Sequence, residues 1–318
     1  RVRLCRSEVW RRRNGARVKP AERAAGGQGA GTVTPIADLY GRQVLVRLIP
    51  PTGDARELRS PLKVSWTTKK ATTGTPATAT IKIYNAAPDS IQAMQDRQSV
   101  IELWVGYSGR NAAGALDPNR IGPLKLIWRG NPVPFGVKVE SQPPNTIMTV
   151  EASDGGAITS TGYVSISFAT QTTPAQVLQE ALRQTGIPAD SVSYPMSPVF
   201  DGGFRFQGRV VDLFQRLAVA TGNTWYIRDG AFVFAGGDEA AGEIVLIAST
   251  TGMVGSPTPK SDGSVEVKIL INPAVRVGGL VEVQSVQVNG VYKVQTLESE
   301  GDSREGPFYM KLTAIKQG

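Results

Sequence analysis

Strict alternation of apolar and polar residues is the feature that most limits how this chain can fold. In residues 77–85, ATATIKIYN, the apolar residues Ala79, Ile81 and Ile83 are separated by single threonine or lysine residues. A period of two places such apolar side chains on one face of a β-strand. The same pattern returns in residues 264–271. We therefore expect a protein built mainly from β-strands.

The first part of the chain body, residues 36–152, has six strand patterns and one short helix. The predicted strands are residues 43–49, 61–66, 77–85, 100–107, 124–128 and 146–152. Asn85 breaks the alternation of the third strand, and Pro88 begins a helix that ends near Arg97. Six strands and one helix in about 115 residues have the proportions of a compact barrel or sandwich.

Residues 153–244 combine helical and strand patterns, which predicts a small α/β module. A first helix begins with Thr173 as N-cap and Pro174 at the first helical position, and it stops at Gly186. A second helix covers residues 210–220 and ends at Gly222. The strands expected here are residues 203–208 and a hairpin, residues 225–234, that turns on Asp229 and Gly230.

Residues 245–318 return to strand patterns. The predicted strands are residues 264–271, 280–288, 291–297 and 308–315. Asn272-Pro273 ends the first of them, because proline cannot donate a hydrogen bond to a central sheet strand. Asn289-Gly290 is expected to form the first turn of the following meander. The predicted fold class is therefore mainly β, with a two-helix α/β insert.

Basic residues are concentrated in residues 1–35, which contain nine Arg or Lys and two Glu, a charge of +7. The rest of the chain has 26 basic and 25 acidic residues, a charge of +1. Because the first segment is Gly/Ala-rich and aperiodic, we expect a disordered tail. It is either a translated extension outside the natural protein, which we favour, or an arm that contacts phosphate. The nearly neutral body gives no general electrostatic reason to bind nucleic acid.

Cysteine and histidine are scarce, which narrows the possible chemistry. The only cysteine is Cys5, so an intramolecular disulfide is impossible. The chain has no histidine, which excludes Ser-His-Asp and Cys-His catalysis and most zinc sites. No apolar run approaches the roughly 20 residues that a membrane-spanning helix needs. We predict no catalytic, cofactor or metal site and no membrane insertion.

Two acidic groups are the only candidates for cation binding or acid–base chemistry. The first lies in ESEGDSREG and consists of Glu298, Glu300, Asp302 and Glu305. It lacks the spacing of an EF-hand, and we expect a solvated loop between two strands. The second lies in EASDGG and consists of Glu151 and Asp154. Asp-Gly-Gly is typical of a turn, so we expect a turn there rather than catalysis.

Aromatic and basic residues on the predicted strands have structural interpretations. The four strand tryptophans are Trp66, Trp104, Trp128 and Trp225. Their long separations favour core or interface packing over a sugar-stacking platform. The basic residues expected to face outward are Lys63, Lys82 and Arg129.

Several short motifs, taken in order, resemble those of phage baseplate hub proteins. Ile81-Lys82-Ile83-Tyr84-Asn85, a short helix and then residues 101–109 are similar to the family's N-terminal barrel. TGMVGSP at 251–257, LINP at 270–273 and VYKV at 291–294 are similar to its C-terminal part. The resemblance covers about residues 39–317, including the two-helix middle, and rests on the order and spacing of these motifs together.

The resemblance implies a structural, non-enzymatic homotrimer that joins a hexameric tail tube to a trimeric spike. Each subunit would contribute two tube-like β-barrel domains, residues 36–152 and 245–318, flanking the α/β module. Three subunits would then present six barrels to the tube and leave a channel for transient passage of DNA. Other implied partners are the tape-measure protein and further baseplate proteins. The implied location is the virion tail baseplate of a phage, or a similar injection machine, assembled in the bacterial host cytoplasm.

Two other functions compete with this hypothesis. One is a tail-tip peptidoglycan hydrolase or cell-wall-binding module, which the absence of histidine and of an acidic catalytic motif disfavours. The other is nucleic-acid binding through the basic tail. The pattern of residues 77–97 alone would also fit an ordinary β-domain with a crossover helix.

Overall fold

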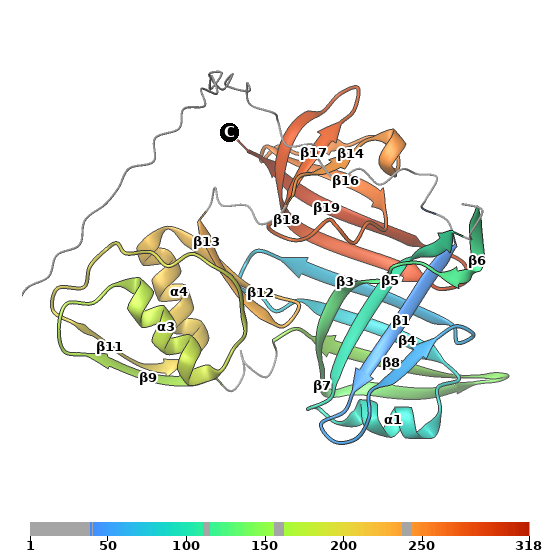
Figure 1. The fold of residues 1–318 in the computed structure, drawn as a ribbon, viewed down its shortest axis with the longest axis horizontal. Helices are drawn as coiled ribbons and strands as arrows, with labels where there is room; N and C mark the ends of the chain where they lie inside the picture. The colour runs from blue at the N-terminus through green and yellow to red at the C-terminus, as the bar shows by residue number, and fades with distance from the viewer. Residues whose placement is uncertain (1–38, 40, 111–114, 156–161, 237–242, 318) are drawn as a thin grey trace, which may run out of the picture. The chain divides into compact units, whose positions relative to one another are not determined.

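The structure is a computed structural model that describes residues 39, 41–110, 115–155, 162–236 and 243–317. The predicted basic tail, residues 1–35 with Cys5, lies outside the described residues. The described chain is mainly β, as predicted, and Figure 1 gives the labels used below.

The first β-rich segment contains eight strands and one helix among the described residues. They are β1 (Arg42–Ile49), β2 (Arg56–Arg59), β3 (Val64–Ala71), β4 (Thr78–Tyr84), α1 (Pro88–Gln95), β5 (Val100–Arg110), β6 (Leu116–Ile121), β7 (Lys125–Gln142) and β8 (Asn145–Ser153). All six predicted strands occur here, while the short strands β2 and β6 were not predicted. β7 runs far beyond the predicted 124–128, through an irregularity between Pro132 and Val137.

The second segment alternates strands with two helices. It consists of β9 (Tyr163–Phe168), α3 (Pro174–Thr185), β10 (Ala189–Val192), β11 (Phe204–Arg209), α4 (Val210–Thr221), β12 (Asn223–Arg228) and β13 (Ala231–Gly236). The third segment consists of β14 (Val245–Ile247), a 3-10 turn (Ser249–Thr251), β15 (Thr258–Pro259), β16 (Ser264–Leu270), β17 (Leu280–Gln284), β18 (Asn289–Asp302) and β19 (Phe308–Lys316).

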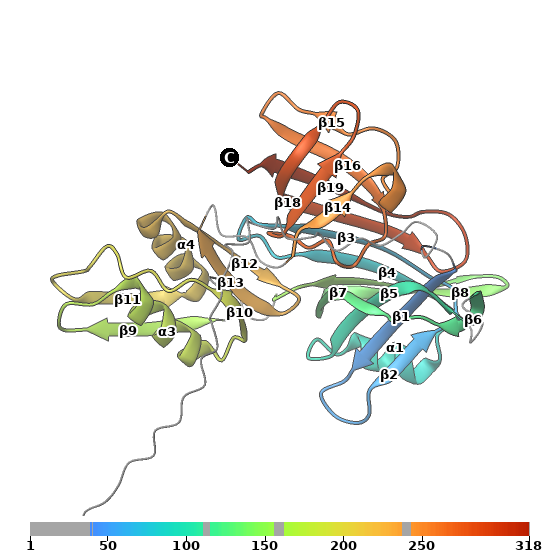
Figure 2. The ribbon, with the colours of Figure 1, turned by 45° about the horizontal axis from the view of Figure 1, so that its top comes forward.

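One large, mostly antiparallel sheet joins the first and third segments. Among the described residues it has 14 strands, with the main order β15-β16-β19-β18-β3-β4-β8-β7-β5-β1-β2. The connection is the pairing of β18 with β3, in which Glu300 lies opposite Thr67. Figure 2 shows β16, β19 and β18 side by side in the third segment. The two β-rich segments are therefore hydrogen-bonded to each other, and their division into two barrels stays a prediction.

The alternating residues form the core of this sheet, as predicted. Ile81 and Ile83 are fully buried on β4, and Val267 and Ile269 are buried on β16. Each such side chain contributes roughly 1.5–3 kcal/mol through removal of apolar surface from water. Buried residues of the first and third segments belong to one continuous apolar cluster. The first and third segments are therefore joined both by backbone hydrogen bonds and by a shared apolar core.

Asn85 ends β4 through specific hydrogen bonds. Its backbone has a positive φ of 56°, a conformation that asparagine tolerates better than most residues. Its side-chain Oδ1 accepts a hydrogen bond from the backbone N–H of Thr146 at 2.9 Å, and its Nδ2 donates to Asn145 Oδ1 at 3.0 Å. The chain then enters α1 at Pro88, and this helix packs on β7 and β1 with Met94 fully buried.

The second segment has its own apolar core between the two helices and the small sheets. Thr173 forms the capping box of α3 with Gln176, and Gly186 ends the helix in the left-handed conformation, as predicted. Figure 1 shows α3 beside α4, and the two helices are in contact. The predicted hairpin is β12–β13, and its turn residues Asp229 and Gly230 both have positive φ, at 53° and 85°.

Two local predictions for the third segment were wrong. Asn289 and Gly290 are the first residues of β18 rather than a turn; residues 285–288 turn instead, closed by hydrogen bonds between Ser285 and Val288. The acidic run ESEGDSREG, residues 298–306, was expected to be a loop between two strands. Residues 298–302 instead belong to β18, and only residues 303–307 connect β18 to β19.

Candidate functional site

The acidic run at the end of β18 is occupied by contacts within the protein. Glu298 forms an ion pair with Lys69 at 3.4 Å, and Glu300 accepts a hydrogen bond from the Tyr309 hydroxyl at 2.7 Å. Asp302 Oδ1 accepts hydrogen bonds from the backbone N–H groups of residues 304 and 305. Across the described part of the chain, no group of three or more Cys, His, Asp or Glu is arranged to hold a metal ion.

The two residues of the EASDGG motif have different environments. Glu151 is exposed on β8 and forms an ion pair with Lys138 at 3.4 Å. Asp154 is fully buried just after β8, and its Oδ1 accepts a hydrogen bond from the backbone N–H of Gly230 at 2.8 Å. Asp154 and Gly155 lie in a turn, as predicted, but sequence reasoning missed that Asp154 contacts the β12–β13 hairpin.

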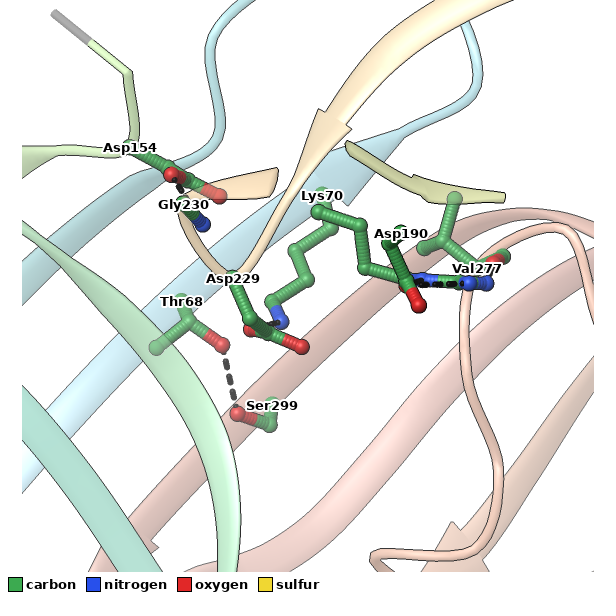
Figure 3. Close-up of polar contacts among 9 residues, drawn as sticks. Thr68, Lys70, Asp154, Asp190, Asp229, Gly230, Val277 and Ser299 are labelled. Carbon is green, nitrogen blue, oxygen red and sulfur yellow. Dashed lines mark hydrogen bonds and ion pairs between the residues drawn. The ribbon is translucent and has the colours of Figure 1, made fainter. Parts of the chain in front are cut away.

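Polar contacts hold the β12–β13 hairpin against the large sheet, at a site that we call the hairpin junction (Figure 3). Lys70 at the end of β3 forms an ion pair with Asp229 in the hairpin turn. The backbone N–H of Gly74 donates to the Trp225 carbonyl at 3.0 Å. With the Asp154 contact, these bonds join the turn and first strand of the hairpin to the β3–β4 and β8 regions of the sheet.

A buried arginine attaches the same hairpin to the third segment. Arg228 Nε donates to Asp190 Oδ2 at 2.9 Å, and its Nη1 donates to the Val277 carbonyl at 3.3 Å (Figure 3). Only 7% of the Arg228 side chain is exposed, against 43% for Asp190. Because a guanidinium cannot be deprotonated in a protein, its burial requires these acceptors.

The Asp154 carboxyl has an unusual electrostatic environment within the hairpin junction. Burial raises the pKa of Asp154 to about 7, while the Lys70 ammonium acts in the opposite direction and the Asp229 carboxylate raises it further. Its Oδ2 atom is buried without a hydrogen-bond partner among the described residues. Burial of a carboxyl with one unsatisfied oxygen disfavours the ionised form relative to an exposed carboxyl.

Close packing supplements the polar bonds of the hairpin junction. A Cβ atom added to Gly278 would lie 2.0 Å from the Tyr226 hydroxyl oxygen, and Gly278 has a φ of +77°. Only glycine fits this combination of conformation and distance without strain. Burial raises the pKa of the Tyr226 hydroxyl. The junction can therefore fix the hairpin in place.

The predicted tryptophan and cation positions are largely confirmed. Trp66, Trp128 and Trp225 are buried, and Trp104 is half-buried. Lys82 and Arg129 are exposed strand residues. Lys63 instead precedes β3, is half-buried and lies 3.5 Å from the Asp302 carboxylate.

Apolar side chains also remain at the surface of the described residues. Phe135 on β7 is 93% exposed, and Val139 on the same strand is 44% exposed. Val286, in the β17–β18 turn, is fully exposed. None of the helices in the described ranges has the length and apolar character needed to cross a membrane.

Comparison with known proteins gives a family and a fold. The model of the baseplate hub gp41 family matches residues 45–314. The 43 kDa tail protein of prophage MuSo2 from Shewanella oneidensis superposes with a TM-score of 0.58 at 9% identity, over 87% of this chain and 97% of that one. A tail protein from Neisseria meningitidis gives a TM-score of 0.58 at 11% identity, over 88% and 98%.

A third solved structure extends the likeness beyond phages. The E. coli c3393 protein, a type VI secretion component structurally similar to T4 tail proteins gp27 and gp5, gives a TM-score of 0.55 at 13% identity, over 82% of this chain and 75% of that one. No match was found among curated protein sequences. At these identities the likeness shows the fold, while the family model covers most of the chain: the protein belongs to the baseplate hub gp41 family.

Proposed function

We propose that this protein is the trimeric hub that joins a hexameric tail tube to a trimeric spike in a phage tail baseplate. The observation that supports this most strongly is the match to the baseplate hub family over residues 45–314. A structural role in the baseplate follows from membership of that family. The trimeric ring and its contacts with tube and spike are the further step that we propose.

The proposed ring depends on two β-rich lobes in each subunit. We assign the lobes to residues 36–152 and 245–318, and the α/β module to residues 153–244. Both lobes contribute antiparallel strands to the large sheet, and β3 and β18 join them edge to edge. Three subunits would then present six similar lobes around one axis. A closed ring of this kind matches six-fold and three-fold partners without any subunit adopting a second conformation.

The charge distribution supports a channel for passing DNA. Outside residues 1–35 the chain has a net charge of only +1. A strongly basic lining would hold DNA by displacing its counterions, which would oppose movement of the genome. A nearly neutral body is compatible with transient passage, so DNA is proposed as cargo and not as a bound ligand.

Exposed apolar side chains supply candidate contacts between subunits or with baseplate partners. Phe135 has both an exposed ring and a positive φ of 59°, so the chain holds this aromatic residue outward in a conformation of higher energy. Aromatic residues contribute strongly to the centres of protein interfaces. We propose that Phe135 contacts a neighbouring subunit of the trimer, which would assemble with the tube, spike, tape-measure and other baseplate proteins in the host cytoplasm.

Sedimentation-velocity ultracentrifugation of the purified protein and of two variants at tens of micromolar tests this function. The expected result is a trimer for the unmodified chain and a reduced trimer fraction for Phe135→Ser, with an unchanged unfolding midpoint because the ring is exposed. Val219→Ser, which removes a side chain that is 74% exposed on α4, is the matched control and should remain trimeric. A protein that stays monomeric at tens of micromolar would contradict the proposed ring.

A further inference from the structure

A cavity of about 680 Å³ lies where strands from the first and third segments meet. Its lining includes the start of β1, the end of β5, β16 and the connection from β18 to β19. Three of the lining side chains are the cations Arg42, Lys268 and Arg304, and three are the aromatic residues Tyr107, Phe308 and Tyr309. We call this cavity the cationic pocket.

The three cations of the pocket have no carboxylate partner among the described residues. Arg42 Nη1 donates to the Asp302 carbonyl at 3.4 Å, and Arg304 Nη2 donates to the Pro61 carbonyl at 2.6 Å. Lys268 Nζ lies 3.6 Å from the centroid of the Tyr309 ring. Each cation is therefore positioned by a carbonyl or a ring, and each retains N–H groups that can donate to an incoming anion.

Two of the three acidic groups near the pocket, Asp302 and Glu300, already have partners within the protein. Asp302 accepts two backbone hydrogen bonds and lies 3.5 Å from Lys63. Glu300 accepts the Tyr309 hydroxyl. Glu305 is exposed on the connecting turn, beside the lining residue Gly306. The three cations therefore outnumber the free carboxylates at this position, and the pocket has an excess of positive charge.

The aromatic rings of the pocket are partly covered, which weakens stacking with a nucleic-acid base. The Phe308 ring is buried, with Arg42 at 5.2 Å from its centroid and the rings of Trp66 and Tyr107 edge-on at 5.6 Å. Lys268 covers one face of the half-buried Tyr309 ring. Since sequence-tolerant binding of single strands depends on exposed ring faces, the pocket favours carboxylates over nucleotides.

We propose that the cationic pocket binds the carboxylate side chains of an acidic segment of another polypeptide. Charge complementarity selects an acidic partner, and the concave site can enclose several of its side chains. That the partner is a baseplate protein rests on the proposed function, whereas its acidic character rests on the pocket alone. The contact would lie where the first and third segments join and would therefore engage both of them.

Fluorescence anisotropy with the full-length protein tests this proposal. The probe is a labelled ten-residue peptide of alternating glutamate and glycine, compared with the same peptide containing glutamine and with a ten-nucleotide thymidine strand. The variant K268Q/R304Q removes two exposed cations of the pocket. The control variant K82Q/R205Q removes the same charge at exposed strand positions that have no ion pair among the described residues.

The expected result is binding of the glutamate peptide that K268Q/R304Q weakens at least about tenfold and K82Q/R205Q changes less than twofold. A carbodiimide should also cross-link the peptide to Lys268, as identified by mass spectrometry. Absence of binding, an equal loss in both variants, or cross-linking confined to Lys19 of the basic tail would overturn the proposal. Tighter, pocket-dependent binding of the oligonucleotide would replace it with a nucleic-acid site. Trimer formation is measured separately, so failure of the ring hypothesis leaves this result interpretable.

Discussion

The variant Asp154→Asn is expected to remove most of the pH dependence of stability between pH 5 and 7. Burial raises the pKa of this carboxyl to about 7 in the folded protein, from an ordinary value of 3.8. Between these two values the folded chain holds a proton that the unfolded chain releases. Stability therefore falls as the pH rises through this window and levels off above pH 7.

The size of the expected change in stability follows from the difference between the folded and unfolded pKa values of Asp154. One proton contributes about 1.4 kcal/mol per pH unit, and this slope halves as the pH reaches the folded-state pKa, so the free energy of unfolding should fall by about 2 kcal/mol from pH 5 to pH 7. The charged groups close to Asp154 are Lys70 and Asp229, and Arg129 lies near Gly230. All three are retained in Asp154→Asn. Histidine, which ordinarily titrates in this range, is absent from the chain.

Urea unfolding followed by tryptophan fluorescence at pH 5, 6, 7 and 8 measures this effect. Asp154→Asn should give a nearly constant free energy of unfolding, whereas the unmodified protein and the control Asp54→Asn, at an exposed loop position, should share the fall. An identical pH dependence in the unmodified protein and Asp154→Asn would refute the assignment of the titrating group.

Three further changes test the packing and polar contacts described above. Gly278→Ala should destabilise the protein by about 2–4 kcal/mol in urea unfolding, because its Cβ meets the Tyr226 hydroxyl and its φ is positive; a neutral effect would show that the backbone relaxes freely there. Arg228→Met should cost about 1–2 kcal/mol, because Asp190 is 43% exposed and water can replace the lost guanidinium donors; protection of the β12–β13 amides from hydrogen exchange should fall, and unaltered protection would count against the contact. Thr173→Ala should cost about 1 kcal/mol through loss of the N-cap of α3, whereas Thr173→Ser should retain most of the stability, so equal losses in both would contradict the capping role.

The strands with strict alternation could be predicted from the sequence because burial of one face imposes a period of two. β4 and β16 are examples, with buried residues at every second position. The helix α3 was equally clear, since its N-cap, first-turn proline and terminal glycine are local signals. Short strands such as β2 and β6 have mixed composition and exist through pairing with β1 and β5, which no local pattern indicates.

The contacts of the hairpin junction could not be predicted from the sequence. Asp154 lies in a motif typical of exposed turns, and its burial results from Gly230, 76 positions later in the chain. The Lys70–Asp229 pair spans an even longer interval. The error at Asn289-Gly290 has a different, local cause: residues 285–288 close the turn through Ser285, so the asparagine and glycine join the strand instead. At the hairpin junction, by contrast, contacts between residues far apart in the sequence decide the local structure.

Cryo-electron microscopy of the purified assembly tests the proposed hub most directly. Three copies of the chain should close a ring in which lobes from residues 36–152 and 245–318 alternate at near-sixty-degree intervals around an open channel. If the particles are single chains, or if the two lobes occupy different rings or cannot be superposed on a common tube-type scaffold, three subunits do not reproduce a six-fold surface and the proposed hub is wrong.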